Sequence, residues 1–165
     1  MKKILSIIVL FSVMVCFSGN ITVFALDKST IQKEFVENRR LILSLQKDLS
    51  WAILDYQQDK ITNQKLFDIS KEILFNQQLA EIALDKKDRI SEIFEVLDEN
   101  FSYQNRDLLL TAQAIQKAAQ HLLHAASSAA KIPSANSTEA KMYIEIADLY
   151  LHIVNIYDSL TMYNL

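Results

Sequence analysis

Glycine and proline are almost absent from this chain of 165 residues, which contains only Gly19 and Pro133. Glycine-rich phosphate loops, tight hairpins and closed β-structures need residues that adopt positive φ at low cost, and glycine is the main one. The sequence therefore argues against nucleotide-binding α/β folds, β-barrels and β-sandwiches. Because half of the residues are apolar, the chain can still build a core, and helices are the elements left to build it from.

The first 25 residues have the layout of a secretory signal peptide. Lys2 and Lys3 precede an uncharged apolar or small run at 4–17, and Val23 and Ala25 provide small residues at the cleavage positions. Those fourteen residues would span about 21 Å as a helix, less than the roughly 30 Å hydrocarbon core of a bilayer. We expect cleavage after Ala25 and secretion or display at the cell surface. The alternative is an uncleaved N-terminal membrane anchor.

The remaining residues, 26–165, carry 15 Lys and Arg against 20 Asp and Glu and contain no cysteine. This acidic balance predicts that nucleic acid is not a partner. Without disulfides, an exported domain is held together by its core alone, and 140 residues are enough for one. The two lysines at the start and the high content of Ile, Lys and Asn indicate a Gram-positive bacterial origin.

Apolar residues recur at alternating steps of four and three in four segments of the chain. This spacing predicts helices that pack along one face, and no segment has the period of two that strands require. We expect helices at about 29–58, 63–99, 103–131 and 137–161. The connections are short, so successive helices should run antiparallel. The predicted fold class is all-α, an up-and-down antiparallel four-helix bundle with heptad-like packing.

In each predicted helix the residues at this spacing form a row that we expect to face the core. Asn38 interrupts the row of the first helix, and Asn76 and Lys87 interrupt that of the second. Flanking apolar residues widen the rows, among them Ile93 in the second helix. The rows are Ile31, Phe35, Ile42, Leu45, Leu49, Ala52 and Tyr56; Leu66, Ile69, Ile73, Ala80, Ala83, Ile90, Phe94 and Leu97; Leu108, Thr111, Ile115, Ala118, Leu122, Ala125 and Ala129; and Met142, Ile146, Leu149, Ile153, Ile156 and Leu160.

The second helix is unusually long. At 1.5 Å per residue it measures about 55 Å, against about 40 to 45 Å for the others. The charged segment 85–89 is a place where it could kink, but the apolar spacing continues across it, which predicts one continuous helix. Thr62 or Asn63 can cap its start, and Asn136 with Glu139 can cap the start of the fourth helix.

The third helix holds eight alanines between residues 112 and 130. Alanine has the highest helix propensity, and its small side chain lets neighbouring helices approach closely. We therefore expect this helix to be tightly packed.

His121, Asp148 and His152 are the candidate metal ligands, because facing helices of a bundle can bring such side chains together. At 100° per residue, however, nearby His124 points to solvent and Asp148 and His152 lie on a flank. The favoured interpretation is a row of solvated His and carboxylate side chains, with no cofactor. Since no nucleophile follows a turn beside a base, we also expect no catalytic site, so the chain is predicted not to be an enzyme.

Tyr143, Tyr150 and Tyr157 are spaced by seven residues along one edge of the fourth helix, next to Ala147 and Val154. Such tyrosines are often half-buried core residues, but tyrosine is also enriched at interfaces, so this edge is the candidate interaction surface.

The sequence therefore predicts an exported, non-catalytic bundle that acts structurally or by protein–protein interaction at the cell surface or outside the cell. Its partner would be an unidentified protein or a second copy of the chain. One alternative is a membrane-active, toxin-like or pore-forming protein, whose Ala-rich third helix refolds into lipid. The other is a bundle that binds a metal or a small ligand.

Overall fold

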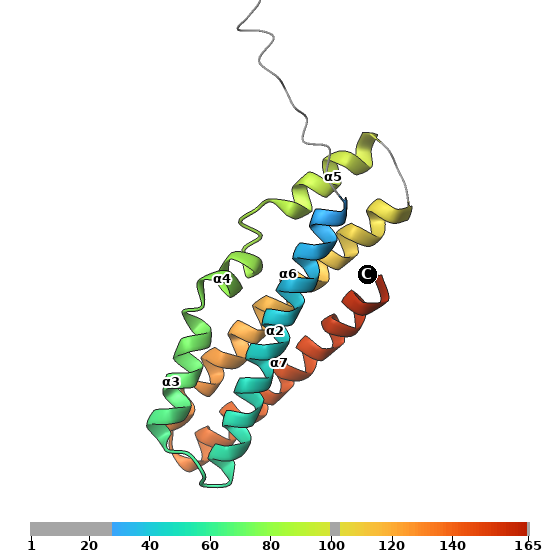
Figure 1. Ribbon diagram of the computed structural model, residues 1–165. Helices are drawn as coiled ribbons and strands as arrows, with labels where there is room; N and C mark the ends of the chain where they lie inside the picture. The colour runs from blue at the N-terminus through green and yellow to red at the C-terminus, as the bar shows by residue number, and fades with distance from the viewer. Residues whose placement is uncertain (1–27, 100–102, 165) are drawn as a thin grey trace, which may run out of the picture.

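The computed structural model describes residues 28–99 and 103–164, which are almost entirely helical (Figure 1). This part of the chain contains six α-helices and one short 3-10 helix and no strand, so the prediction of an all-α fold is confirmed. The predicted signal peptide lies outside the described residues. The elements are α2 (Lys28–Gln57), α3 (Asn63–Leu74), α4 (Gln77–Ala83), α5 (Arg89–Glu99), α6 (Tyr103–Ala129), η1 (Ile132–Ser134) and α7 (Ser137–Asn164).

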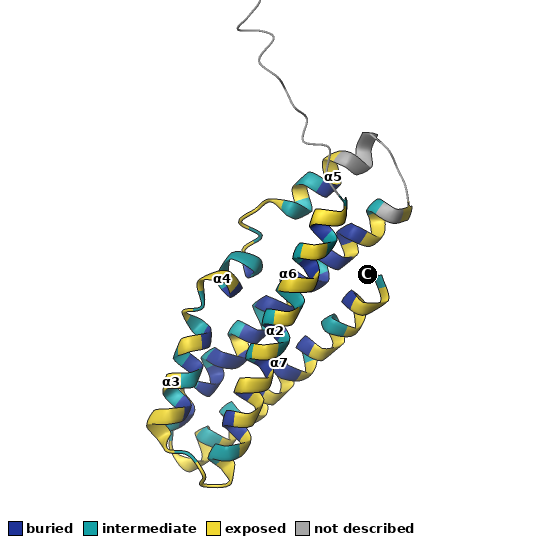
Figure 2. Cartoon of the chain, in the orientation of Figure 1, coloured by how far each residue is buried: buried dark blue, intermediate teal, exposed yellow. Residues whose placement is uncertain are grey.

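The long helices α2, α6 and α7 lie beside a segment in which α3, α4 and α5 follow one another end to end (Figure 1). The chain direction alternates from α2 to the α3–α5 segment, then to α6 and to α7. α6 contacts each of the other five α-helices, and α2 also contacts α3, α4 and α7. The core therefore forms around α6, as the buried residues in Figure 2 show.

The packing of α6 matches the predicted core row at every position. Most of its alanines are buried as well, including Ala119, Ala125 and Ala126, each with no exposed surface. Because these side chains are small, several helices can approach one helix at once. The buried residues of the predicted row are Leu108, Thr111, Ile115, Ala118, Leu122, Ala125 and Ala129.

The prediction of one continuous helix over 63–99 is wrong, and the first break lies after α3. Phe75 ends α3, and Asn76 begins the next helix, where its side-chain oxygen accepts a hydrogen bond from the Leu79 amide at 2.9 Å. Asn76 was expected in the core row. It serves instead as the N-cap of α4, a role that asparagine suits because its short side chain satisfies an unpaired helix amide.

The second break lies between α4 and α5, where the chain turns without glycine. Asp85 and Asp88 adopt positive φ angles of 50° and 51°, a conformation that aspartate tolerates better than most residues. The Asp85 carboxylate accepts hydrogen bonds from the Arg89 and Ile90 amides, both at 3.2 Å, and so caps α5.

This second break also shifts which face of the chain is buried. Ile93, predicted on the flank, has no exposed surface, whereas Phe94, predicted in the core row, is 49% exposed. The non-helical residues 84–88 between α4 and α5 change the rotation of α5 relative to α4, so the heptad spacing no longer identifies the inner face.

The predicted core row of the fourth helix is wrong as well, because α7 buries a different face from the one that we expected. The buried residues are Ala147, Leu151, Val154 and Thr161. Two contacts with α2 fix this rotation. Arg39 donates two hydrogen bonds to the Asp158 carboxylate, at 2.6 and 3.0 Å, and the Gln46 amide donates to Leu151 O and Asn155 Oδ1 at 3.1 and 2.8 Å.

Two predicted helix starts are confirmed. The Thr62 hydroxyl accepts a hydrogen bond from the Lys65 amide at the start of α3. At the start of α7, Asn136 Oδ1 accepts from the Glu139 amide, while the Glu139 carboxylate accepts from the Asn136 amide, which completes a capping box. Among the helices described, none has a stretch that is both long and apolar enough to cross a bilayer.

Candidate interaction surface

The outer face of α7 is a row of large apolar side chains that the fold leaves uncovered. Met142, Leu149, Ile156 and Leu160 are 46%, 60%, 59% and 48% exposed, and Tyr163 is almost fully exposed. Ile146 and Ile153 lie between them and are half-buried. We call this row the α7 seam: Met142, Ile146, Leu149, Ile153, Ile156, Leu160 and Tyr163.

An apolar groove adjoins the seam near the C-terminal end of α7. It has a volume of about 580 Å³ and lies between α5, α6 and α7. Leu110, a large apolar residue of α6 that is itself exposed, forms part of its wall. The groove is lined by Ile90, Leu110, Gln113, Ala114, Gln116, Lys117, Tyr157, Leu160 and Asn164.

The predicted tyrosine edge faces α6 and is half-buried. Tyr150 and Tyr157 stack on the His121 ring with centroid distances of 5.7 and 5.6 Å, and Tyr150 also stacks on His124 at 5.2 Å. Lys131 Nζ lies 5.5 Å from the centre of the Tyr143 ring, a cation–π contact. The tyrosines therefore form the border between α6 and the seam.

His121 is the most constrained titratable side chain in this border. Burial, with smaller contributions from the nearby charges of His124 and Lys117, lowers the pKa of His121 below its ordinary value. Its Nδ1 atom is buried and has no hydrogen-bond partner. The neutral imidazole is thus the form that this stack of rings accommodates.

The three candidate metal ligands do not form a cluster. His121 is held among the tyrosines, whereas Asp148 and His152 are exposed on α7, one turn apart. Partial desolvation of its carboxyl group raises the pKa of Asp148, although the neighbouring His152 acts in the opposite direction. Over the described ranges 28–99 and 103–164, no three His, Cys, Asp or Glu side chains are close enough to hold a metal ion. His124 is exposed, as predicted.

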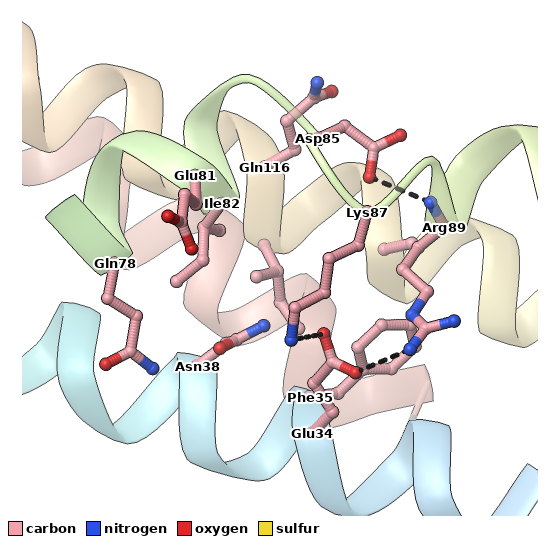
Figure 3. A pocket seen from close by; sticks show the side chains of 12 residues that line it. Glu34, Phe35, Asn38, Gln78, Glu81, Ile82, Asp85, Lys87, Arg89 and Gln116 are labelled. Carbon is pink, nitrogen blue, oxygen red and sulfur yellow. Dashed lines mark hydrogen bonds and ion pairs between the residues drawn. The ribbon is translucent and has the colours of Figure 1, made fainter.

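A small charged pocket lies between α2, α4 and α6 (Figure 3). Its volume of about 60 Å³ has room for about two water molecules. Glu34 accepts hydrogen bonds from Lys87 and Arg89, both at 3.1 Å. Burial acts to raise the pKa of Glu34, but these two cations outweigh it and lower the pKa. The charged groups here mostly pair with one another, which joins the turn before α5 to α2.

Comparisons with known proteins found no matching family model, no similar curated protein and no similar solved structure.

The seam residues other than Tyr163 were identified from the sequence, but as core residues. α7 carries two apolar rows side by side, and the spacing alone does not show which one faces inward. One signal was available in the sequence. The buried positions include Ala147, Val154 and Thr161, whose side chains are smaller than those of the row of Met, Leu and Ile and therefore suit close approach to the Ala-rich third helix better.

Proposed function

We propose that this chain is an exported, non-catalytic four-helix bundle that acts by protein–protein interaction through the α7 seam, at the cell surface or outside the cell. The exposure of the seam carries the proposal. A monomeric soluble protein seldom leaves a continuous apolar strip along a whole helix, because covering such a strip gains free energy from the hydrophobic effect. A strip of this kind is typical of a surface that a partner covers.

The geometry of the pocket beside Glu34 and of the groove beside the seam favours a non-catalytic role. A substrate pocket typically has a volume of about 300 to 1,000 Å³ with a few convergent polar groups. The pocket beside Glu34 is too small for this, and its carboxylate is already held by Lys87 and Arg89. The groove beside the seam is large enough, but it is mainly apolar, which suits a hydrophobic side chain of a partner better than a reacting group.

A photo-crosslinking experiment in the native cells tests this function. A photoreactive amino acid replaces Leu149 in the seam, and the matched control replaces Lys47, an exposed residue of α2. We expect a specific crosslinked product from position 149 and none from position 47. The proposal fails if position 149 gives no product, or if both positions give the same products.

Export is tested by the intact mass of the protein in medium, wall and membrane fractions. A mass that begins at Leu26 in the medium or wall supports cleavage after Ala25. Full-length protein confined to the membrane would make residues 4–17 an anchor and place the bundle at the membrane surface.

A membrane-active protein is the second candidate, because an exposed apolar helix face can also lie on lipid. Helices that do so are usually rich in Lys and Arg on their polar face, whereas the polar residues of α7 include Lys141 as the only Lys or Arg. Dye release from liposomes of phosphatidylglycerol and phosphatidylcholine separates the candidates. Leakage that depends on Leu149 would favour membrane activity, and intact liposomes would favour the interaction protein. For the third candidate, a metal-binding bundle, the arrangement of His121, Asp148 and His152 gives no support.

A further inference from the structure

The spacing of the α7 seam identifies the kind of structure that can cover it. From Met142 to Tyr163 the seven positions follow one another at steps of 4, 3, 4, 3, 4 and 3. An α-helix has 3.6 residues per turn, so a mean spacing of 3.5 keeps a row in contact with another helix that coils around it. The partner of such a row is another helix with apolar residues at the same spacing.

The size of the available surface suits a dimer. The 22 residues from Met142 to Tyr163 are about 33 Å long at 1.5 Å per residue. The seam is one helix wide, and only at the C-terminal end of α7 does the adjoining groove, which includes exposed Leu110 of α6, widen the apolar face to two helices. A face about 33 Å long and roughly 10 to 20 Å wide covers on the order of 300 to 700 Å², less than the roughly 800 Å² that each partner contributes to an interface of standard size, which fits a weak and reversible dimer.

The residues beside the seam favour a second copy over a charged partner or a membrane. One border is the row Tyr143, Tyr150 and Tyr157, and the other consists of Glu145, His152 and Ser159. Coiled coils that select a different partner usually carry opposite charges at these bordering positions. Here Glu145 is the single full charge, so two copies can pair without bringing rows of like charge together.

From these observations we infer that two copies of this chain associate through their α7 helices, with the seam of one copy packed against the seam of the other. This inference rests on the proposed function, since it names the partner that covers the seam. In a symmetric interface every exposed seam residue is used twice, once by each copy, which makes the apolar row of one helix sufficient for a complete interface.

Analytical ultracentrifugation over a wide concentration range tests this inference. The protein used is the cleaved or the full-length form, whichever the intact-mass measurement finds in the cells. We expect a monomer–dimer equilibrium for the wild type. The double variant Leu149→Asp/Ile156→Asp should raise the dissociation constant by roughly a hundredfold or more, because charges replace two central apolar contacts on each copy. Both side chains are exposed, so the helix content and melting temperature of the variant monomer should stay unchanged.

The control variant Trp51→Asp/Leu54→Asp places the same charges at exposed apolar residues of α2. It should dimerise like the wild type. A wild type that stays monomeric at all concentrations, or a dimer that the seam variant does not weaken, would overturn the inference. So would a dimer that the control variant weakens equally.

The ultracentrifugation and crosslinking results together separate failure of this inference from failure of the proposed function. If the wild type is monomeric but position 149 still crosslinks to a different protein in cells, the interaction function stands and self-association is wrong. If the wild type is monomeric and position 149 gives no product, both are wrong. Binding of the monomer to liposomes would identify lipid as the occupant of the seam and would also contradict self-association.

Discussion

α6 and α7 have 27 and 28 residues and pack against each other, but they carry apolar side chains of different size. α6 presents mainly alanines between a few leucines and contacts all other α-helices of the described part. α7 presents Met, Leu, Ile and Tyr on two faces and contacts neighbours with only one of them. Small side chains thus allow a helix to have many neighbours within one molecule, whereas large ones on a free face favour a neighbour from outside it.

Replacing a leucine with alanine should change the free energy of unfolding much more in α6 than in α7, and this is the largest difference that we expect. Leu122→Ala in α6 removes a side chain with no exposed surface and should lower the free energy of unfolding by about 2 to 5 kcal/mol. Leu149→Ala in α7 removes a side chain that is 60% exposed and should change the stability of the monomer by no more than about 0.5 kcal/mol. Urea unfolding at concentrations where the chain is monomeric measures both. Equal losses would contradict the burial difference between the helices.

Enlarging an alanine of α6 tests whether small size is what lets the helices approach. Ala125 has no exposed surface, so Ala125→Leu should force neighbouring side chains apart and lower the free energy of unfolding by about 1 to 3 kcal/mol. Lys47→Leu on α2 adds a leucine at an exposed position outside the seam and is the matched control. Thermal unfolding of the two variants compares them, and an unchanged melting temperature for Ala125→Leu would mean that space is left beside α6.

The pair Arg39 and Asp158 tests what holds α7 in its rotation. The two side chains are 28% and 20% exposed and form two hydrogen bonds, so they should interact more strongly than a surface pair, with a coupling energy of about 1 kcal/mol. A double-mutant cycle of Arg39→Ala and Asp158→Ala, followed by urea unfolding, isolates this coupling. Independent, additive losses would show that Gln46 and the core alone set the rotation.

The smallest effect that we expect is a dependence of stability on pH, which comes from His121 at the border between α6 and α7. Burial lowers the pKa of His121 in the folded chain below its ordinary value of 6.5. The unfolded chain therefore takes up the proton more readily. The stability that this group contributes is fully present above pH 6.5 and is lost as pH falls through that value toward the folded pKa.

The variant His121→Gln isolates this effect in unfolding measurements from pH 8 to pH 5. We expect a flatter profile than that of the wild type over this range. Glu34 does not interfere, because its lowered pKa makes its own contribution disappear only at more acidic pH. An identical slope in both proteins would mean that the stack on Tyr150 and Tyr157 accepts the imidazolium ion as readily as water does.

The sequence predicted best the bounds of the three long helices. The observed bounds of α2, α6 and α7 differ from the predicted ones by no more than three residues, and the α6 row was correct throughout. α6 was favourable because it packs against five other α-helices, so most of its apolar residues, inside and outside the predicted row, are buried.

The errors have two physical causes. Between 63 and 99 the apolar spacing continues across both breaks, and spacing alone does not distinguish an asparagine in a core from an asparagine that caps a helix, as Asn76 does. In α7 two apolar rows compete, and the choice between them depends on Arg39 and Gln46, which lie more than 100 residues away in the sequence. The sequence therefore placed the candidate surface on the tyrosine edge, one row away from the apolar row that the structure leaves exposed.

The contact between Arg39 and Asp158 also has a consequence for how the chain folds. The two residues are 119 positions apart, whereas α6 and α7 are joined by a short connection around η1. Because contacts between nearby segments cost less loop entropy, the α6–α7 hairpin should form early and the docking of α7 on α2 should come late. A chain crossing a membrane from its N-terminus would thus hold α2 without its last neighbour until the final helix had emerged.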